Sequence, residues 1–92
     1  MSKYSVLISK QAKKYLEANK RLQKAFDDWQ PSLSENPHNA HDGILIGEKK
    51  EGLQVYKKAL VVKKYRALYT VDDENISVLI FKVNSRGDVY KK

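Results

Sequence analysis

The chain has 92 residues, of which 41% are hydrophobic and 32% are charged. This length leaves room for one domain over residues 1–92 and excludes a second catalytic module, because a domain this small buries only about two-thirds of its unfolded surface. The composition excludes a disordered tail and a membrane protein. The 18 Lys and Arg against 11 Asp and Glu give a formal net charge of +7, so the expected partners are polyanions: nucleic acid, anionic lipid or an acidic protein.

The sequence has no cysteine, which excludes disulfides, thiolate metal sites and thiol-based enzyme mechanisms and is typical of a reducing compartment. The N-terminal segment lacks the long apolar run of a signal peptide. Purely apolar stretches such as Val78–Phe81 are far shorter than a membrane span. We therefore expect a cytoplasmic protein that is neither exported nor inserted into a membrane.

The charge is unevenly distributed along the chain. Residues 1–30 contain 7 basic and 3 acidic residues, residues 31–55 contain 2 and 4, and residues 56–92 contain 9 and 4. The positive excess therefore lies in the first and last thirds of the chain. A surface that faces a polyanion is expected there.

The N-terminal third predicts a strand followed by two short helices that form a hairpin. Tyr4, Val6 and Ile8 alternate with their neighbours as in a strand. Ser9 is the predicted N-cap of an amphipathic helix, because Ala12, Tyr15, Leu16 and Asn19 follow it at helical spacing. Pro31 is expected to kink or stop the second helix. The stripe of that helix comprises Leu22, Ala25, Phe26, Trp29 and Leu33.

The rest of the chain predicts strands. Residues 34–43 (SENPHNAHDG) favour a surface loop, Glu48–Gly52 a turn, and residues 72–75 an acidic hairpin loop before the last strand and a short basic tail. The predicted strands are Gly43–Gly47, Leu53–Val61, Lys64–Val71 and Ile76–Val83. The expected fold class is α+β: a small, mainly antiparallel sheet with an N-terminal strand, a helical hairpin packed on one of its faces, and then three or four consecutive C-terminal strands.

Four residues could serve a ribonuclease that uses no metal ion or other cofactor. Such an enzyme deprotonates a ribose 2′-hydroxyl, protonates the leaving oxygen and stabilises the phosphorane between these steps. Lys57, Arg66, Arg86 and Tyr90 lie on, or just after, strands expected to be neighbours. Arginine binds phosphate oxygens with a planar fork, and tyrosine stacks on a base or passes a proton. Free lysine and tyrosine titrate near about 10.4 and about 10, so either needs nearby cations, such as Lys58, to act as a base at neutral pH.

Each of these residues also has a structural interpretation. Arg86 could belong to an ordinary turn, and Tyr90 could close the core. Arg66 lies in an apolar strand and could instead form a structural salt bridge, for which the acidic candidates are Glu48, Asp72 and Asp88.

The loop at residues 34–43 contains His38, His41 and Asp42, three possible metal ligands within five positions. No fourth ligand accompanies them, and a site confined to one short loop would be weak. We therefore predict no metal site.

The C-terminal half resembles the RelE-type toxins of the RelE/ParE toxin–antitoxin superfamily. The resemblance is carried by Tyr56-Lys57, by Tyr65-Arg66 with Leu68-Tyr69 in the next strand, and by the closing residues 83–90 (VNSRGDVY). Residues 33–37 (LSENP) and 45–47 (LIG) are similar to the helix end and second strand of the same family. The match spans nearly the whole chain.

The resemblance implies a toxin that cleaves mRNA in the ribosomal A site and is silenced by a cognate acidic, RelB-like antitoxin. Lys57 would be a basic active-site residue, Arg66 and Arg86 would hold the scissile phosphate, and Tyr90 would stack on the mRNA or assist proton transfer. This sequence has Ala59 where studied members have a second lysine. The other lysines assigned to RNA or ribosome contacts are Lys10, Lys13, Lys14, Lys58, Lys63, Lys64 and Lys82.

Two other functions are compatible with the sequence. One is a relative in the same superfamily that poisons DNA gyrase, because Ala59 departs from the nuclease pattern. The other is a non-catalytic RNA-binding member of the family. For Lys63 and Lys64 a solvated position at a sheet edge is the simpler interpretation.

Overall fold

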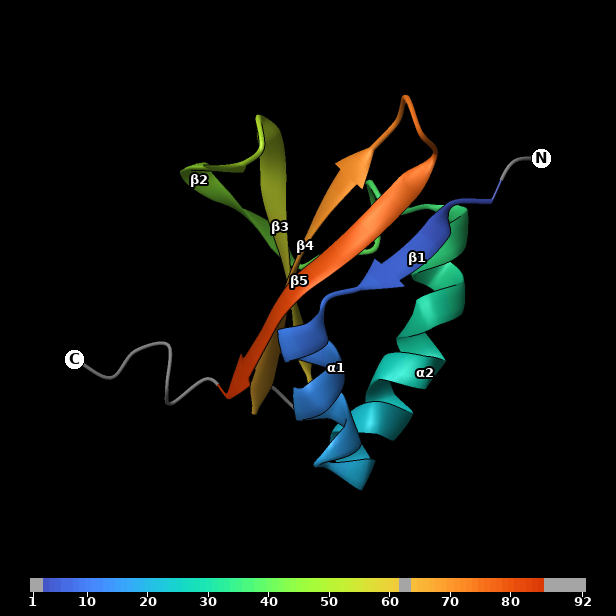
Figure 1. The fold of residues 1–92 in the computed structure, drawn as a ribbon, viewed down its shortest axis with the longest axis vertical. Helices are drawn as coiled ribbons and strands as arrows, with labels where there is room; N and C mark the ends of the chain where they lie inside the picture. Colours follow the sequence, from blue (N-terminus) through green and yellow to red (C-terminus); the bar gives the residue numbers. More distant parts are fainter. Residues whose placement is uncertain (1–2, 62–63, 86–92) are drawn as a thin grey trace.

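The structure is a computed structural model, and it describes residues 3–61 and 64–85. Within these ranges the chain forms a strand, two helices and then four strands, in the order that the sequence predicts (Figure 1). The elements are β1 (Ser5–Ile8), α1 (Lys10–Glu17), α2 (Lys20–Glu35), β2 (Gly43–Lys50), β3 (Leu53–Leu60), β4 (Tyr65–Asp72) and β5 (Ser77–Ser85). In this part of the chain, no helix is long and apolar enough to cross a membrane.

The described strands form one sheet with the order β1-β5-β4-β3-β2. β1 pairs with β5 in parallel, and all other neighbours are antiparallel. β1 and β2 are the two edges, while both helices lie on one face (Figure 1). The predicted α+β class and the mainly antiparallel sheet are confirmed.

Both helices begin at side-chain caps. The Ser9 hydroxyl accepts a hydrogen bond from the Ala12 amide at 3.2 Å, as the sequence predicts. Asn19 caps α2 in the same way, because its side-chain oxygen accepts from the Leu22 amide at 3.1 Å. Two consecutive caps explain why the chain forms two helices rather than one long helix.

The second helix does not stop at Pro31, and it is not short: α2 has 16 residues and ends at Glu35. The turn beyond the proline is held by tertiary contacts. Leu33 is fully buried, and Ser34 forms two hydrogen bonds with Tyr4, one from its hydroxyl to the Tyr4 carbonyl (2.8 Å) and one from the Tyr4 amide to its carbonyl (2.9 Å). These contacts offset the backbone hydrogen bond that proline cannot donate.

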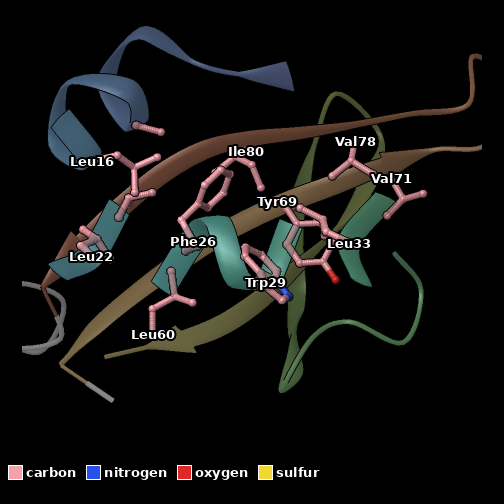
Figure 2. Close-up of a cluster of buried hydrophobic side chains, with 13 residues drawn as sticks. Leu16, Leu22, Phe26, Trp29, Leu33, Leu60, Tyr69, Val71, Val78 and Ile80 are labelled. Carbon is pink, nitrogen blue, oxygen red and sulfur yellow. The ribbon is translucent and has the colours of Figure 1, made fainter. Parts of the chain in front are cut away.

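The core lies between the helices and the sheet. Figure 2 shows Phe26, Trp29 and Leu33 of α2 lying against Tyr69 of β4 and Ile80 of β5. Ala12 and Leu16 of α1 belong to the same buried cluster. Burial of this apolar stripe on the sheet is the main force that fixes both helices to one face.

An aromatic column anchors the loop after α2 to the sheet. His41 stacks on Tyr56 at a centroid distance of 4.8 Å, Tyr56 stacks on Tyr69 at 5.3 Å, and Trp29 contacts Tyr69 edge to face at 5.5 Å. The buried Tyr69 hydroxyl donates to the Pro37 carbonyl at 2.7 Å, and burial raises the pKa of this phenol well above its ordinary value. The loop is therefore tied to the middle of β4.

We expect Tyr69→Phe to lower the free energy of unfolding by about 1–3 kcal/mol, because it leaves the buried Pro37 carbonyl without its donor. Urea denaturation followed by Trp29 fluorescence measures the change. Tyr56→Phe is the matched control, since the Tyr56 hydroxyl contacts the exposed His38 at 3.3 Å. Equal losses in both variants would contradict the role assigned to the buried bond.

The β2–β3 hairpin is longer than predicted. β2 continues through Gly47 to Lys50, and the turn consists of Glu51 and Gly52, both with positive φ, as in the tight turns that suit the twist of hairpins. Gly47 has a φ of 83° and lies where the register between β2 and β3 shifts. The glycine thus forms an irregularity within the strand rather than ending it.

A second irregularity lies between β4 and β5. Tyr69 pairs with Ile80, but Leu68 pairs with Lys82, so Phe81 is an extra residue in β5. Beyond this bulge the buried residue is Val83. A continued alternation from Val78 and Ile80 would have turned Lys82 toward the helices; the bulge turns it to the other face.

Candidate functional site

Lys57 and Arg66, two of the four predicted catalytic residues, lie within the described ranges on the sheet face opposite the helices. Pairing register defines two neighbouring rows of side chains across β3, β4 and β5, because directly opposed residues share a face. We call the surface formed by these rows the open face. The first row is Lys57, Leu68 and Lys82, and the second is Ala59, Arg66 and Asn84.

Alternation places this surface on the side away from the helices. Tyr56 pairs with Tyr69, and Ala67 pairs with Val83; all four belong to the helix-packed cluster or contact it. Lys57, between Tyr56 and Lys58, therefore projects to the opposite side. Lys57 and Arg66 are diagonal neighbours in the ladder, a relationship that puts side-chain bases about 7–8 Å apart.

The Lys57 side chain lies across β2 above Gly43. The two residues are paired in register, and a Cβ atom built on Gly43 would approach the Lys57 Cε atom to 3.0 Å. A side chain at position 43 would therefore crowd the end of the lysine and shift it by a few tenths of an ångström. Glycine leaves this space free, and this role is not visible in the sequence, where Gly43 ends a turn-rich loop.

Asp42 fixes the backbone of β3 around Lys57. Its amide donates to the Lys57 carbonyl at 2.8 Å, and its carboxylate accepts from the Ala59 amide at 2.6 Å. The other carboxylate oxygen lies 3.6 Å from the Lys58 ammonium. Lys58 pairs with Ala67 of the helix-packed cluster, so it projects to the helix side, as its position in the strand predicts, and it does not share the face of Lys57.

The cations of the first row have no acidic partner among the carboxylates whose placement the structure describes. None of those carboxylates lies within 4.0 Å of the Lys57 or Lys82 ammonium. Lys57 is half-buried and Lys82 is exposed. Cations without a described acidic partner favour an anionic ligand on this face.

One structural alternative for Arg66 does not apply. Asp72 lies six residues away along β4, about 20 Å at the rise of a strand. Its carboxylate accepts hydrogen bonds from the Asn75 amide and side chain, which lower the pKa of Asp72. Asp72 is therefore not the counter-ion of Arg66.

The remaining predicted residues lie elsewhere or outside the described ranges. Lys64 is exposed in the turn before β4. Residues 63, 86 and 90 lie outside the described residues, so the roles of Lys63, Arg86 and Tyr90 stay predictions. On the helical layer, the exposed lysines of α1 are Lys10, Lys13 and Lys14.

The loop histidines and Asp42 each make their own contacts with the sheet and its turns. His38 bonds through Nε2 to the Asp73 carboxylate at 2.8 Å, and that oxygen also accepts from the Tyr4 hydroxyl at 2.6 Å. His41 stacks on Tyr56, while Asp42 bonds to β3. The three candidate ligands thus serve different contacts, and the first of these contacts joins the loop to the β4–β5 turn.

The contact between His38 and Asp73 predicts that the stability of the fold decreases in acid. Hydrogen bonds from Tyr4 and His38 lower the pKa of Asp73 below its ordinary value. A carboxylate with a lowered folded-state pKa stabilises the fold above its unfolded pKa, and the contribution is lost as pH falls through the folded value. Thermal unfolding should therefore show a decrease in stability below about pH 4 that Asp73→Asn reduces. An unchanged acid limb in Asp73→Asn would contradict this assignment.

Comparison with known proteins assigns the chain to a family. A family model described as "ParE toxin of type II toxin-antitoxin system, parDE" matches residues 6–90. No curated protein matches the sequence.

Solved structures with the same fold are RelE toxins. The archaeal RelE–RelB complex from Pyrococcus horikoshii gives a TM-score of 0.71 at 26% identity, covering 95% of this chain and 98% of that one. The Mycobacterium tuberculosis toxin–antitoxin complex RelBE2 gives 0.66 at 26% identity, covering 96% and 97%. A mutant of Escherichia coli RelE in the free state gives 0.69 at 21% identity, covering 98% and 88%, and supports the fold alone. The resemblance read from the sequence is confirmed at the level of the superfamily, and the chain belongs to the ParE toxin family of type II toxin–antitoxin systems, within the RelE/ParE superfamily.

Proposed function

We propose that this toxin is a metal-independent endoribonuclease that cleaves mRNA in the ribosomal A site and so inhibits translation. The observation that carries the proposal is the open face, where Lys57 and Arg66 are diagonal neighbours and Lys82 extends the same surface. The similarity to RelE structures at 26% identity supports the choice of RNA over other polyanions. Cytoplasmic action follows from the proposed substrate.

In the proposed reaction, the ribose 2′-oxygen attacks the adjacent phosphorus, and the bond to the 5′-oxygen of the next nucleotide breaks. The products are a 2′,3′-cyclic phosphate and a 5′-hydroxyl end, and the proton lost by the 2′-hydroxyl is balanced by the one gained by the leaving oxygen. Arg66 binds the phosphate with its planar guanidinium, and the Lys57 ammonium stabilises the additional negative charge of the phosphorane. Lys82 binds a neighbouring phosphate.

The absence of a second cation beside Arg66 affects the expected rate of cleavage. Ala59 pairs directly with Arg66, so the second row contributes one cation rather than two. The predicted residues Arg86 and Tyr90 would complete the site by holding the phosphate and by stacking or proton transfer. We expect a working but slower nuclease than one with lysine at position 59.

The test is cleavage of a defined mRNA by the purified chain on programmed ribosomes, with both ends of each fragment mapped. We expect cuts at fixed codon positions in the A site and fewer cuts in free RNA. Binding to ribosomes without cutting would instead identify a non-catalytic RNA-binding family member.

Gyrase poisoning is the second candidate function. It is favoured by the description of the matching family as ParE toxins and by Ala59 in place of a lysine. A supercoiling assay with purified gyrase separates the two functions. Inhibition of supercoiling without mRNA cleavage would replace the nuclease proposal.

A cognate antitoxin is the proposed protein partner. Two of the similar structures are toxin–antitoxin complexes, and this chain has a net charge of +7. An acidic antitoxin that folds on binding would gain affinity both from charge and from apolar contacts. The partner should co-purify with the toxin when both are expressed from their native operon, and it should abolish cleavage. A toxin that purifies alone and harmlessly would contradict this proposal.

A further inference from the structure

The open face contains an aromatic ring that the nuclease chemistry does not use. Phe81 is the extra residue of the β5 bulge, and it directly precedes Lys82. The ring is half-buried and is absent from the core cluster between the helices and the sheet. Both residues of the bulge thus present side chains away from the helices, one apolar and one cationic.

A lysine from the far edge of the sheet covers this ring. The Lys50 ammonium lies 5.1 Å from the centroid of Phe81, within the range of a cation–π contact. Lys50 ends β2, which β3 and β4 separate from β5. The sheet must therefore curl so that its β2–β3 hairpin approaches β5 over the open face. Val55 and Thr70, which pair on this face, are accordingly 2% and 3% exposed.

We propose that Phe81 is a stacking platform for a nucleobase of the RNA that flanks the cleaved bond, with Lys50 moving from the ring to a phosphate. This inference rests on the proposed nuclease function. Aromatic side chains bind unpaired bases by stacking, and every base offers a π face, so the contact supplies affinity and position without a strict sequence preference. The cation that now occupies the ring face is a long, flexible side chain that a base can displace at small cost.

The position of the ring suits a base next to the reacting phosphate. Lys82, adjacent to Phe81, belongs to the row that reaches Lys57 through Leu68. Two strand spacings separate Lys82 from Lys57, about 10 Å. A phosphate held by Lys57 and Arg66 would therefore place a flanking nucleotide over β5, where Lys50 lies over the ring and Lys82 follows it in the strand.

The competing account is that Phe81 only packs beside Val55 and Thr70 beneath the curled hairpin. The two accounts differ in what the ring does for the substrate. Packing predicts that removing the ring affects stability whatever the RNA carries at the flanking position. Stacking predicts that the ring increases the cleavage rate only when the flanking nucleotide carries a base.

The experiment measures single-turnover cleavage on programmed ribosomes of a parent mRNA and of two mRNAs with an abasic nucleotide, one on each side of the cut. The unmodified toxin should cut one abasic mRNA about 5- to 100-fold more slowly than the parent, the effect of losing one stacked base. Phe81→Leu should be slow on the parent and should lose this difference, whereas Phe81→Tyr should keep both rate and difference. Thermal unfolding confirms that each variant is folded.

Two further variants separate the ring from the charges. Lys57→Ala should cut slowly but retain the full penalty for the abasic nucleotide, because it alters chemistry and not stacking. Lys50→Met should lose a few-fold in rate and also retain the penalty.

Equal rates of the unmodified toxin on all three mRNAs would overturn the proposal even if Phe81→Leu failed to fold. So would a Phe81→Leu variant that keeps the abasic penalty. Absence of any cleavage by the unmodified toxin would be a different failure, that of the proposed nuclease function and of this inference with it.

Discussion

Lys57→Ala is expected to slow mRNA cleavage by about 100-fold or more, the effect of removing one charged group that stabilises the transition state. Lys58→Ala is expected to leave the rate close to that of the unchanged toxin. The two lysines are adjacent in β3 and identical in chemistry, but they project to opposite faces of the sheet. The measurement is single-turnover cleavage on programmed ribosomes.

This pair of variants tests the site rather than the net charge. Each removes one positive charge from the same strand, so a general loss of attraction to RNA would affect both equally. Lys58 is paired with Asp42 on the helix side, and loss of this partly exposed ion pair should cost less than about 1 kcal/mol of stability. Similar losses of activity in both variants would place the reaction somewhere other than the open face.

Gly43→Ala is expected to reduce cleavage by a few-fold up to about 10-fold, because the end of Lys57 must shift by a few tenths of an ångström, less than the misplacement of about 1 Å that can cost about 100-fold. A Cβ at this position would lie 3.0 Å from the Lys57 Cε atom, so the lysine must move while its charge remains. The atom displaced is near the end of a flexible side chain. Stability should therefore be nearly unchanged, and the thermal midpoint provides this check.

A double-mutant cycle shows whether Gly43 acts through Lys57. In a Lys57→Ala background, Gly43→Ala should cause no further loss, because the group that it displaces is absent. Ile44→Ala is the matched control: it is the next residue of β2, exposed, and pairs with Tyr56 on the other side of the sheet. A loss of activity from Gly43→Ala that persists without Lys57 would mean that the glycine serves the fold of the hairpin instead.

The sequence by itself determined the order and type of the elements. Alternation at Tyr4, Val6 and Ile8, and helical spacing from Leu22 to Leu33, predicted the first strand and the second helix. These patterns are informative because each element must bury one face, and the spacing of its apolar residues therefore differs between a strand and a helix. Ser9 marked a helix start correctly, since capping depends on a residue and its immediate neighbours.

Local patterns also predicted that Lys57 and Arg66 lie on adjacent strands, and the structure puts them on one face. Their roles in cleavage stay predictions. The residues that support them were not apparent: Gly43 was assigned to the end of a loop, and Phe81 to an ordinary strand. Neither has a local signal, because the space above a glycine and the surroundings of a ring depend on which strands pair.

Only the tertiary structure decided where the regular patterns are broken. The bulge at Phe81 turns Lys82 to the open face, the irregularity at Gly47 extends β2 to Lys50, and packing of Leu33 carries α2 past Pro31. For α2, the tertiary contacts of the last turn outweigh the local preference of proline against a helix interior, about 3 kcal/mol. The two irregularities arise from the pairing of neighbouring strands. Strand register is a property of two strands together, and one residue of slip exchanges the faces of every side chain beyond it. The composition of the open face was therefore fixed by pairing, which no single segment of this chain encodes.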